Sequence, residues 1–103
     1  MANKTKTLQK HMNNVAELGC LVCGRPPHLH HIRPKGTGIG RRSSDYCVIP
    51  LCHDHHQGQF SIHNSKKSFE KKYGTEEELL KKVYRYIYKE HWEEIWKKVT
   101  PLL

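Results

Sequence analysis

Two short patterns of metal-binding residues constrain this chain more than any other feature of its sequence. Cys20 and Cys23 form a C-x2-C pattern, and Cys52 and His55 form a C-x2-H pattern. Residues at this spacing can converge on one ion, and three sulfurs with one nitrogen are a typical tetrahedral zinc set. The sequence therefore predicts a structural zinc site. Because protein ligands would fill all four positions, this site would stabilise the fold and activate no water.

A bound zinc ion would matter for stability because the chain can form only a small hydrophobic core. It has 103 residues, of which 36% are hydrophobic, so it can form one small domain with a thin core. Zinc binding would then supply folding free energy. The fourth cysteine, Cys47, is expected to be a small core residue. As an alternative, Cys47 could replace His55 as the fourth ligand.

The charge of the chain indicates a polyanionic partner. There are 18 Lys and Arg residues against 10 Asp and Glu, a net charge of +8. The excess lies within residues 1–72, which also hold all four cysteines. Basic surfaces attract nucleic acid through counterion release, so DNA is the expected partner, although a merely soluble basic protein would show the same excess.

Apolar segments of the length that a membrane requires are not found in the sequence. No apolar run approaches the roughly 18 residues of a transmembrane helix. The first residues are basic but lack the apolar region of a secretory signal. We therefore expect a cytoplasmic protein without membrane association, in which cysteines bind metal more often than they form disulfides.

Hydrophobic periodicity predicts a single α+β domain over residues 1–103. Apolar side chains recur at helical spacing over residues 6–18. Short β-branched segments at 28–33 and 46–52 are typical of strands, and a basic Gly-rich loop lies between them at 35–44. The core at 20–64 would thus lie between an N-terminal helix and C-terminal helices over about 65–100.

The C-terminal part is expected to form a short helix over 65–73 and then one long helix that ends before Pro101. Thr75 and Glu78 have the spacing of a capping box. An apolar stripe follows at helical spacing, comprising Leu80, Tyr84, Ile87, His91, Ile95 and Val99. We interpret His91 as a packing residue of this stripe and not as a metal ligand.

Aromatic residues are concentrated on the same predicted long helix. They are Tyr84, Tyr86, Tyr88, Trp92 and Trp96. We interpret these rings as packing residues that cover the middle segment. The alternative is an exposed aromatic ridge that docks a protein partner.

A pair of adjacent histidines indicates a second kind of metal site. On a strand, neighbouring residues face opposite sides, so His30 could bind an ion while His31 stays available to accept a proton. His56 and His63 could join His30 if the segment 53–63 curls back. Three protein ligands would leave open positions, as a catalytic metal requires.

Two further histidines are assigned no ligand role. His28 lies two residues before the pair. His53 is one of the two residues between Cys52 and His55 in the C-x2-H pattern. We interpret both as surface residues or as neighbours of the ligands.

In this order the motifs resemble those of the HNH nucleases, which are ββα-metal endonucleases built from two antiparallel strands and a helix around one divalent ion. The sequence is similar in particular to a small phage and prophage branch with the signature D…IPLC..HH…H, which includes recombination-enhancement, recombinase-dependent nucleases. The resemblance covers roughly residues 20–64. Its motifs are Cys20, Cys23, His30, His31, Asp45, the segment 48–52, His55, His56 and His63.

The resemblance implies a small zinc-stabilised ββα-metal core and a role for each motif residue. His31 would be the general base. The catalytic ion, which could be Mg²⁺, Mn²⁺, Ni²⁺ or Zn²⁺, would be bound by His30, His56 and His63. The structural Zn²⁺ would be bound by Cys20, Cys23, Cys52 and His55.

One position departs from the family pattern. The asparagine that gives the motif its middle letter should lie where this chain has Cys47. In the family this asparagine braces the loop that carries the catalytic histidine. We expect Asp45 to take over this bracing, and we expect the departure to affect catalytic efficiency more than the fold.

The expected activity is hydrolysis of DNA phosphodiester bonds with low sequence specificity, in phage or prophage DNA recombination or processing. Phosphate contacts are expected from Arg33, Lys35, Arg41 and Arg42. A recombinase filament is a further candidate partner, and no small-molecule cofactor is expected. Two alternatives stay open, namely a zinc-stabilised nucleic-acid-binding module without catalysis and a recombination accessory protein.

Overall fold

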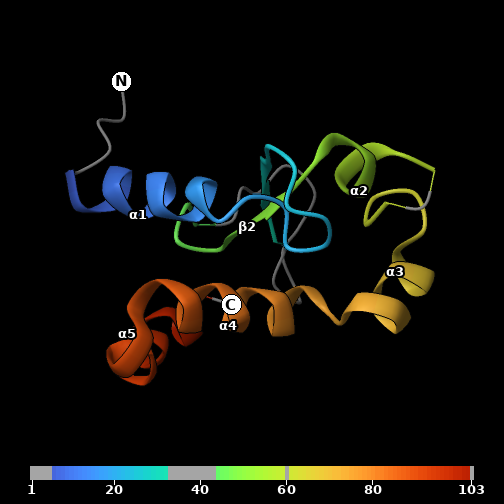
Figure 1. The fold of residues 1–103 in the computed structure, drawn as a ribbon. Helices are drawn as coiled ribbons and strands as arrows, with labels where there is room; N and C mark the ends of the chain where they lie inside the picture. The colour runs from blue at the N-terminus through green and yellow to red at the C-terminus, as the bar shows by residue number, and fades with distance from the viewer. Residues whose placement is uncertain (1–5, 33–43, 60, 103) are drawn as a thin grey trace.

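A two-stranded antiparallel sheet lies at the centre of the computed structural model, which describes residues 6–32, 44–59 and 61–102. Strand β1 (His28–His31) pairs with β2 (Val48–Leu51), and His30 lies opposite Ile49. Helix α1 (Lys6–Glu17) lies on one side of the strands and α4 (Glu76–Tyr88) on the other (Figure 1). The arrangement confirms the α+β class.

Short helices follow the sheet along the chain. Helix α2 (His53–Gln57) begins directly after β2, and α3 (Lys66–Tyr73) leads into α4. The capping box predicted for Thr75 and Glu78 is present at the start of α4. After α4 come a single 3-10 turn, η1 (Lys89–His91), then α5 (Trp92–Val99) and a final turn, η2 (Thr100–Leu102).

The prediction of one long C-terminal helix is wrong. The helix breaks at Lys89, whose φ of 51° lies in a region that residues with a Cβ rarely adopt. Folding back at this point lets α5 pack on α4, so that Val99 is buried and the Trp96 ring lies 5.6 Å from that of Tyr84. His91 lies in the break and is exposed, so its assignment as a packing residue is also wrong.

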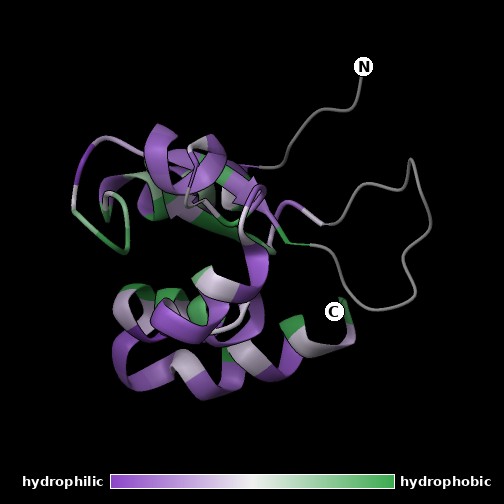
Figure 2. Ribbon diagram, turned by 90° about the vertical axis from the view of Figure 1, so that its right-hand side faces the viewer, coloured by the Kyte–Doolittle hydropathy of each residue, from purple (hydrophilic) through white to green (hydrophobic). Residues whose placement is uncertain are grey.

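Hydrophobic residues gather between the two helical layers. All four residues of β2 are buried, and they meet buried side chains from α1, α3, α4 and α5. Figure 2 shows the apolar residues along the strands and the inner sides of the helices, with hydrophilic residues outward. Cys47 is fully buried in this core, as predicted, and burial raises the pKa of its thiol to about 11.

Most of the aromatic residues near the C-terminus contribute to packing. Tyr84 is buried, and Tyr88, Trp92 and Trp96 are half-buried. Tyr86, with 56% of its surface accessible, is the exposed member of the group. This distribution favours packing over an exposed aromatic ridge. Within the described ranges, no helix combines the length and the apolar character needed to cross a membrane.

A buried histidine, which sequence patterns did not single out, joins α1 to α4. His11 is 2% exposed, and its Nδ1 lies 2.7 Å from the hydroxyl of Tyr88. The hydroxyl of Tyr84 donates to the carbonyl of Tyr46 and lies 3.4 Å from His11 Nε2. Burial lowers the pKa of His11 to about 4, so the imidazole is neutral at neutral pH.

The depressed pKa of His11 predicts that the fold loses stability in acid. An ordinary histidine in the unfolded chain takes up a proton near pH 6.5, whereas folded His11 does so only near pH 4. The unfolded state therefore binds more protons between these values. The free energy of unfolding should fall by about 3 kcal/mol through this group as the pH falls from 6.5 to 4. Urea unfolding of the wild type and of His11→Gln across this range should give a shallower pH dependence for the variant. Parallel curves would contradict the prediction.

Candidate metal centres

The first candidate centre consists of the three cysteines and the histidine of the two predicted patterns. The ligand atoms of Cys20, Cys23, Cys52 and His55 all lie within 4.8 Å of one another. Sγ of Cys52 is 3.1 Å from Nδ1 of His55 and 3.5 Å from Sγ of Cys23. Tetrahedral zinc with ordinary bond lengths needs ligand separations of about 3.5–3.8 Å. The separation of 3.5 Å matches this range, and that of 3.1 Å would have to widen. The four side chains therefore form a cluster that could hold a metal ion, and three sulfurs with one nitrogen are a donor set that suits Zn²⁺.

The backbone around Cys20 explains how these thiols come together. The Gly24 amide donates to the carbonyl of Cys20, and the Cys20 amide donates to the carbonyl of Arg25, which closes a tight turn. Gly24 has a φ of 77° and Gly19 a φ of 73°, and a Cβ on Gly19 would lie 2.9 Å from the carbonyl oxygen of Gly24. A hydrogen bond of 3.0 Å from Leu21 to Pro50 fixes the turn against β2.

The second candidate centre is formed by His30, His56 and His63, whose ligand atoms also lie within 4.8 Å of one another. His30 is buried on β1, His56 is half-buried on α2, and His63 is exposed beyond that helix. The Nε2 atoms of His56 and His63 are 3.0 Å apart. The centroid of the His30 ring lies 5.0 Å and 4.9 Å from those of His56 and His63.

A sharp return of the chain after α2 brings His63 to this group. The Gly58 amide donates to the carbonyl of Asp54 and ends the helix, and the Ile62 amide donates back to the carbonyl of His55. The side-chain amide of Asn64 then donates to the carbonyls of Gln57 and Gly58. The segment 53–63 thus curls back in the described residues, as the assignment of three histidines to one ion requires.

The electrostatics of the second centre favour the neutral form of His56. Burial, together with the charges that neighbouring His30 and His63 would carry, lowers the pKa of His56 to about 4. Its Nδ1 is buried and has no hydrogen-bond partner among the described residues. Neutral imidazole is the form that binds metal, and a set of imidazoles suits divalent transition ions such as Zn²⁺, Ni²⁺ and Fe²⁺. The donor set therefore fits a bound divalent ion.

Each histidine of the adjacent pair contacts a carboxylate. Nε2 of His31 lies 2.7 Å from Oδ1 of Asp45, and 25% of the His31 side chain is exposed. Nε2 of His30 lies 2.8 Å from Oε2 of Glu76. Burial alone would raise the pKa of Glu76, but hydrogen bonds from His30 and Lys66 lower it below its ordinary value. Glu76 therefore stays ionised beside the candidate ion.

One cavity of about 290 Å³ opens beside the second centre. It is lined by His30, His31, Ile62, His63, Lys66 and Glu76. His31 thus shares this space with two of the three histidines that could hold an ion. A group bound in the cavity could contact the candidate ion and His31 at the same time.

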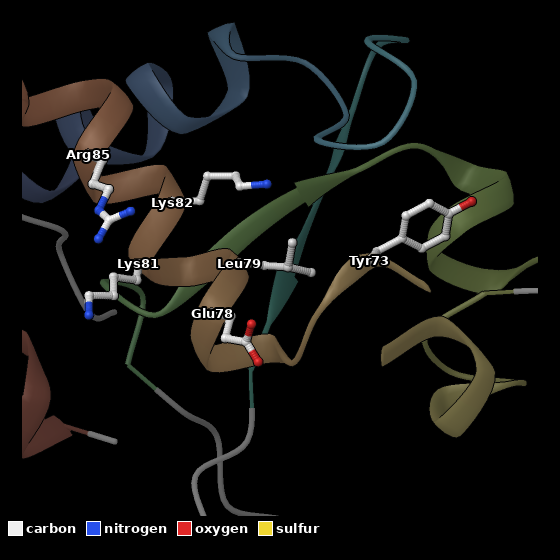
Figure 3. Close-up of a pocket in the computed structure, with 6 residues that line it drawn as sticks. All are labelled: Tyr73, Glu78, Leu79, Lys81, Lys82 and Arg85. Atoms are coloured by element: carbon white, nitrogen blue, oxygen red, sulfur yellow. The ribbon is translucent and has the colours of Figure 1, made fainter. Parts of the chain in front are cut away.

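A separate cavity of about 210 Å³ lies along α4 and does not include these histidines. Figure 3 shows its lining, which comes from α4 and from the end of α3 and comprises Tyr73, Glu78, Leu79, Lys81, Lys82 and Arg85. The Lys81 and Arg85 cations lie 5.6 Å and 4.7 Å from the centre of the Trp92 ring. Two of the three cations of this cavity therefore already contact an aromatic face.

Comparison with known proteins identifies the family. A family model described as "Protein of unknown function (DUF968)" matches residues 2–89. The chain belongs to the DUF968 family. A curated relative, "Uncharacterized protein YdfU" of Escherichia coli (strain K12), is 35% identical over 81 residues, which are 77% of this chain and 22% of the relative. The DUF968 chain thus spans less than a quarter of that protein. No solved structure matches it.

The remaining predicted site residues of the DUF968 chain lie outside these contacts or outside the described residues. The predicted phosphate-binding residues Arg33, Lys35, Arg41 and Arg42 fall outside the described residues. His28 and His53 are exposed. The centroid of the His28 ring lies 5.7 Å from that of His53 and 5.8 Å from that of His56, so His28 borders the second centre.

Sequence patterns missed two residues of the histidine cavity, Lys66 and Glu76. Each opens a helix, α3 and α4 respectively. A charged residue in the first turn of a helix is ordinary, since an acidic residue there stabilises the helix dipole. No local signal therefore separated Glu76 from the neighbouring Glu77 and Glu78. What distinguishes Glu76 is its contact with His30, which lies 46 positions away on β1.

Proposed function

We propose that this DUF968 chain is a metal-dependent endonuclease that hydrolyses DNA phosphodiester bonds with low sequence specificity. The main observation in support of this proposal is that His31 lines the same cavity as His30 and His63, two of the three clustered histidines. His31 also has its own carboxylate partner, Asp45. The order of β1, β2 and α2 around the histidines supports a ββα-metal core of the HNH type, which the sequence resembles.

The side chains of this cavity suit hydrolysis of a phosphodiester. A divalent ion held by His30, His56 and His63 would supply Lewis acidity toward a phosphate oxygen. Because Asp45 accepts a hydrogen bond from Nε2 of His31, the tautomer with a lone pair on Nδ1 is favoured. His31 would take a proton from the attacking water at Nδ1, and Asp45 would stabilise the imidazolium that results.

The structural cluster and the charge of the chain agree with this proposal. We assign the cluster of Cys20, Cys23, Cys52 and His55 to a structural Zn²⁺ that holds β2 and α2 in place. The net charge of +8 favours a polyanionic substrate such as DNA. The sequence resemblance adds phage or prophage DNA recombination as the setting and a recombinase filament as a candidate partner.

Plasmid nicking by His63→Ala tests the proposal. Zinc-loaded protein would be assayed with Mg²⁺, Mn²⁺, Ni²⁺ or Zn²⁺ on supercoiled plasmid, on single-stranded DNA and on recombinase-coated DNA. Removal of His63 should reduce cutting by more than about 100-fold, since even the loss of a residue that only orients a ligand can cost 10–100-fold. His63 is exposed, so the variant should fold and keep its structural zinc.

His53→Ala is the matched control for this experiment. His53 lies on the same helix as His56, is exposed, and does not belong to either cluster. It should cut as the wild type does. Equal cutting by wild type and His63→Ala would refute the assignment of the ion to these histidines. Binding of DNA without cutting under every condition would favour the zinc-stabilised binding module instead.

A further inference from the structure

The carboxylate of Glu76 makes a contact that nothing in its local sequence requires. Glu76 is the first residue of α4, and His30, its partner at 2.8 Å, lies 46 positions earlier on β1. The side chains of Glu76 and His30 are 14% and 7% exposed. The contact therefore links two elements at the inner wall of the cavity, next to the group that could hold an ion.

Support for the helix end does not explain this placement. Three acidic residues occupy the first turn of α4. Glu78 forms the capping box with Thr75, and Glu77 is exposed. The solvent-exposed carboxylates of Glu77 and Glu78 already interact favourably with the helix dipole, so the dipole does not require a buried carboxylate at Glu76. Burial of the carboxylate of Glu76 costs several kcal/mol unless partners compensate, so its inward position needs a reason of its own.

Both oxygens of Glu76 have such a partner. Oε2 accepts from His30, and Oε1 lies 3.1 Å from Nζ of Lys66 at the start of α3. Lys66 also lines the cavity, with more than half of its side chain exposed. Lys66 thus contacts the carboxylate oxygen of Glu76 that His30 does not contact. The chain of contacts runs from Lys66 through Glu76 to His30.

A carboxylate at this distance determines how an imidazole can bind metal. When Nε2–H donates to a carboxylate, the lone pair lies on Nδ1, the ring cannot rotate, and the basicity of the ring increases. His31 has the same arrangement with Asp45. The two adjacent histidines are thus each oriented by a carboxylate from a different part of the chain.

We propose that Glu76 is the positioning residue that orients His30 as a ligand of the divalent ion, and that Lys66 holds Glu76 in place. This inference rests on the proposed function, because it assumes that His30, His56 and His63 bind the ion. It adds to the site a residue from α4, an element outside the segment 20–64 that carries the family resemblance.

Calorimetric titration of Ni²⁺ into the zinc-loaded full chain, without DNA, tests the proposal. Glu76→Ala should weaken Ni²⁺ binding by about 10–100-fold, the range found when the partner of a ligating histidine is removed. Glu76→Gln can still accept the hydrogen bond from His30, and we expect it to restore part of the affinity. Zinc content before and after the titration verifies that the structural site stays occupied.

Glu77→Ala is the matched control, since it removes a neighbouring exposed carboxylate from the same helical turn. It should bind Ni²⁺ as the wild type does. A folded Glu76→Ala protein with wild-type affinity would overturn the proposal. If that variant does not fold, Glu76→Gln decides, and unchanged affinity in that variant would overturn it. A loss with Glu76→Gln as large as that with His63→Ala would overturn it too, in favour of Glu76 as a direct ligand.

The titration separates this inference from the proposed function. Weaker Ni²⁺ binding by Glu76→Ala would support the positioning role even if the wild type cut no DNA. Absence of Ni²⁺ binding by the wild type would instead contradict the ion site itself, and the proposed function with it. Retained binding by Glu76→Ala together with metal-dependent cutting would overturn the inference alone.

Discussion

Cys20→Ser is expected to remove the zinc from this DUF968 chain and, with it, the folded state. Cys20 is buried, and its sulfur lies 3.7 Å from Nδ1 of His55 within the cluster of four ligands. Structural zinc contributes about 10–16 kcal/mol of apparent binding free energy, which is as large as the whole stability of a typical domain. Zinc per chain, by elemental analysis, and circular dichroism on heating would measure both losses.

The effect should be large because the four ligands of the cluster anchor the turn of Cys20 and Cys23 to the start of α2. The turn that carries Cys20 and Cys23 is fixed to β2 by one backbone hydrogen bond, from Leu21 to Pro50. The ion pair between Arg25 and Asp54 also links the turn to α2, but it is exposed and contributes little. The histidine cavity depends on the same cluster, since His56 follows His55 directly.

Cys47→Ala supplies the matched control for the zinc experiment. Cys47 is also a buried cysteine, but it belongs to the hydrophobic core and not to the cluster. Its removal should cost about 1 kcal/mol through lost packing and leave one zinc ion per chain. Loss of zinc from this variant would identify Cys47 as a ligand. A Cys20→Ser protein that stays folded and fully loaded would show that the structural site is assigned wrongly.

The parts of this molecule that the sequence could predict are those set by local spacing. Cys20 and Cys23 form their turn because of the residues between and around them. The strands at His28–His31 and Val48–Leu51 are short and lie within the predicted segments 28–33 and 46–52, and the start of α4 has its capping box. In each case the information lies within a few residues, where propensity and spacing determine the structure.

The parts that could not be predicted depend on partners far away in the sequence. His11 contacts Tyr84 and Tyr88, which are 73 and 77 positions distant. Glu76 differs from its acidic neighbours in being half-buried and in meeting His30 and Lys66. The break at Lys89 interrupts a continuous helical pattern at a residue that favours helices, because packing of α5 on α4 outweighs local propensity there.

His31→Ala is expected to slow DNA cutting strongly while zinc content and thermal stability stay unchanged. A positioned general base contributes about 10²–10⁴-fold to the rate, so nicking should fall by that factor with every active metal. His31 is half-buried at the wall of the cavity and belongs to neither metal cluster, so its removal should not disturb the fold. Plasmid nicking rates, together with zinc analysis and melting curves, would measure both parts of this result.

Two companion variants distinguish the role of His31 from a general loss of positive charge or of structure. His91→Ala removes an exposed imidazole from η1, outside the cavity lining, and should cut normally. Asp45→Asn keeps the size of the partner at 2.7 Å but removes its charge, so the imidazolium that forms during proton transfer is less stable. Its rate should lie between those of wild type and His31→Ala. If wild type and His31→Ala cut equally fast, His31 is not the base, because a residue that takes the proton in the transition state cannot be removed without cost.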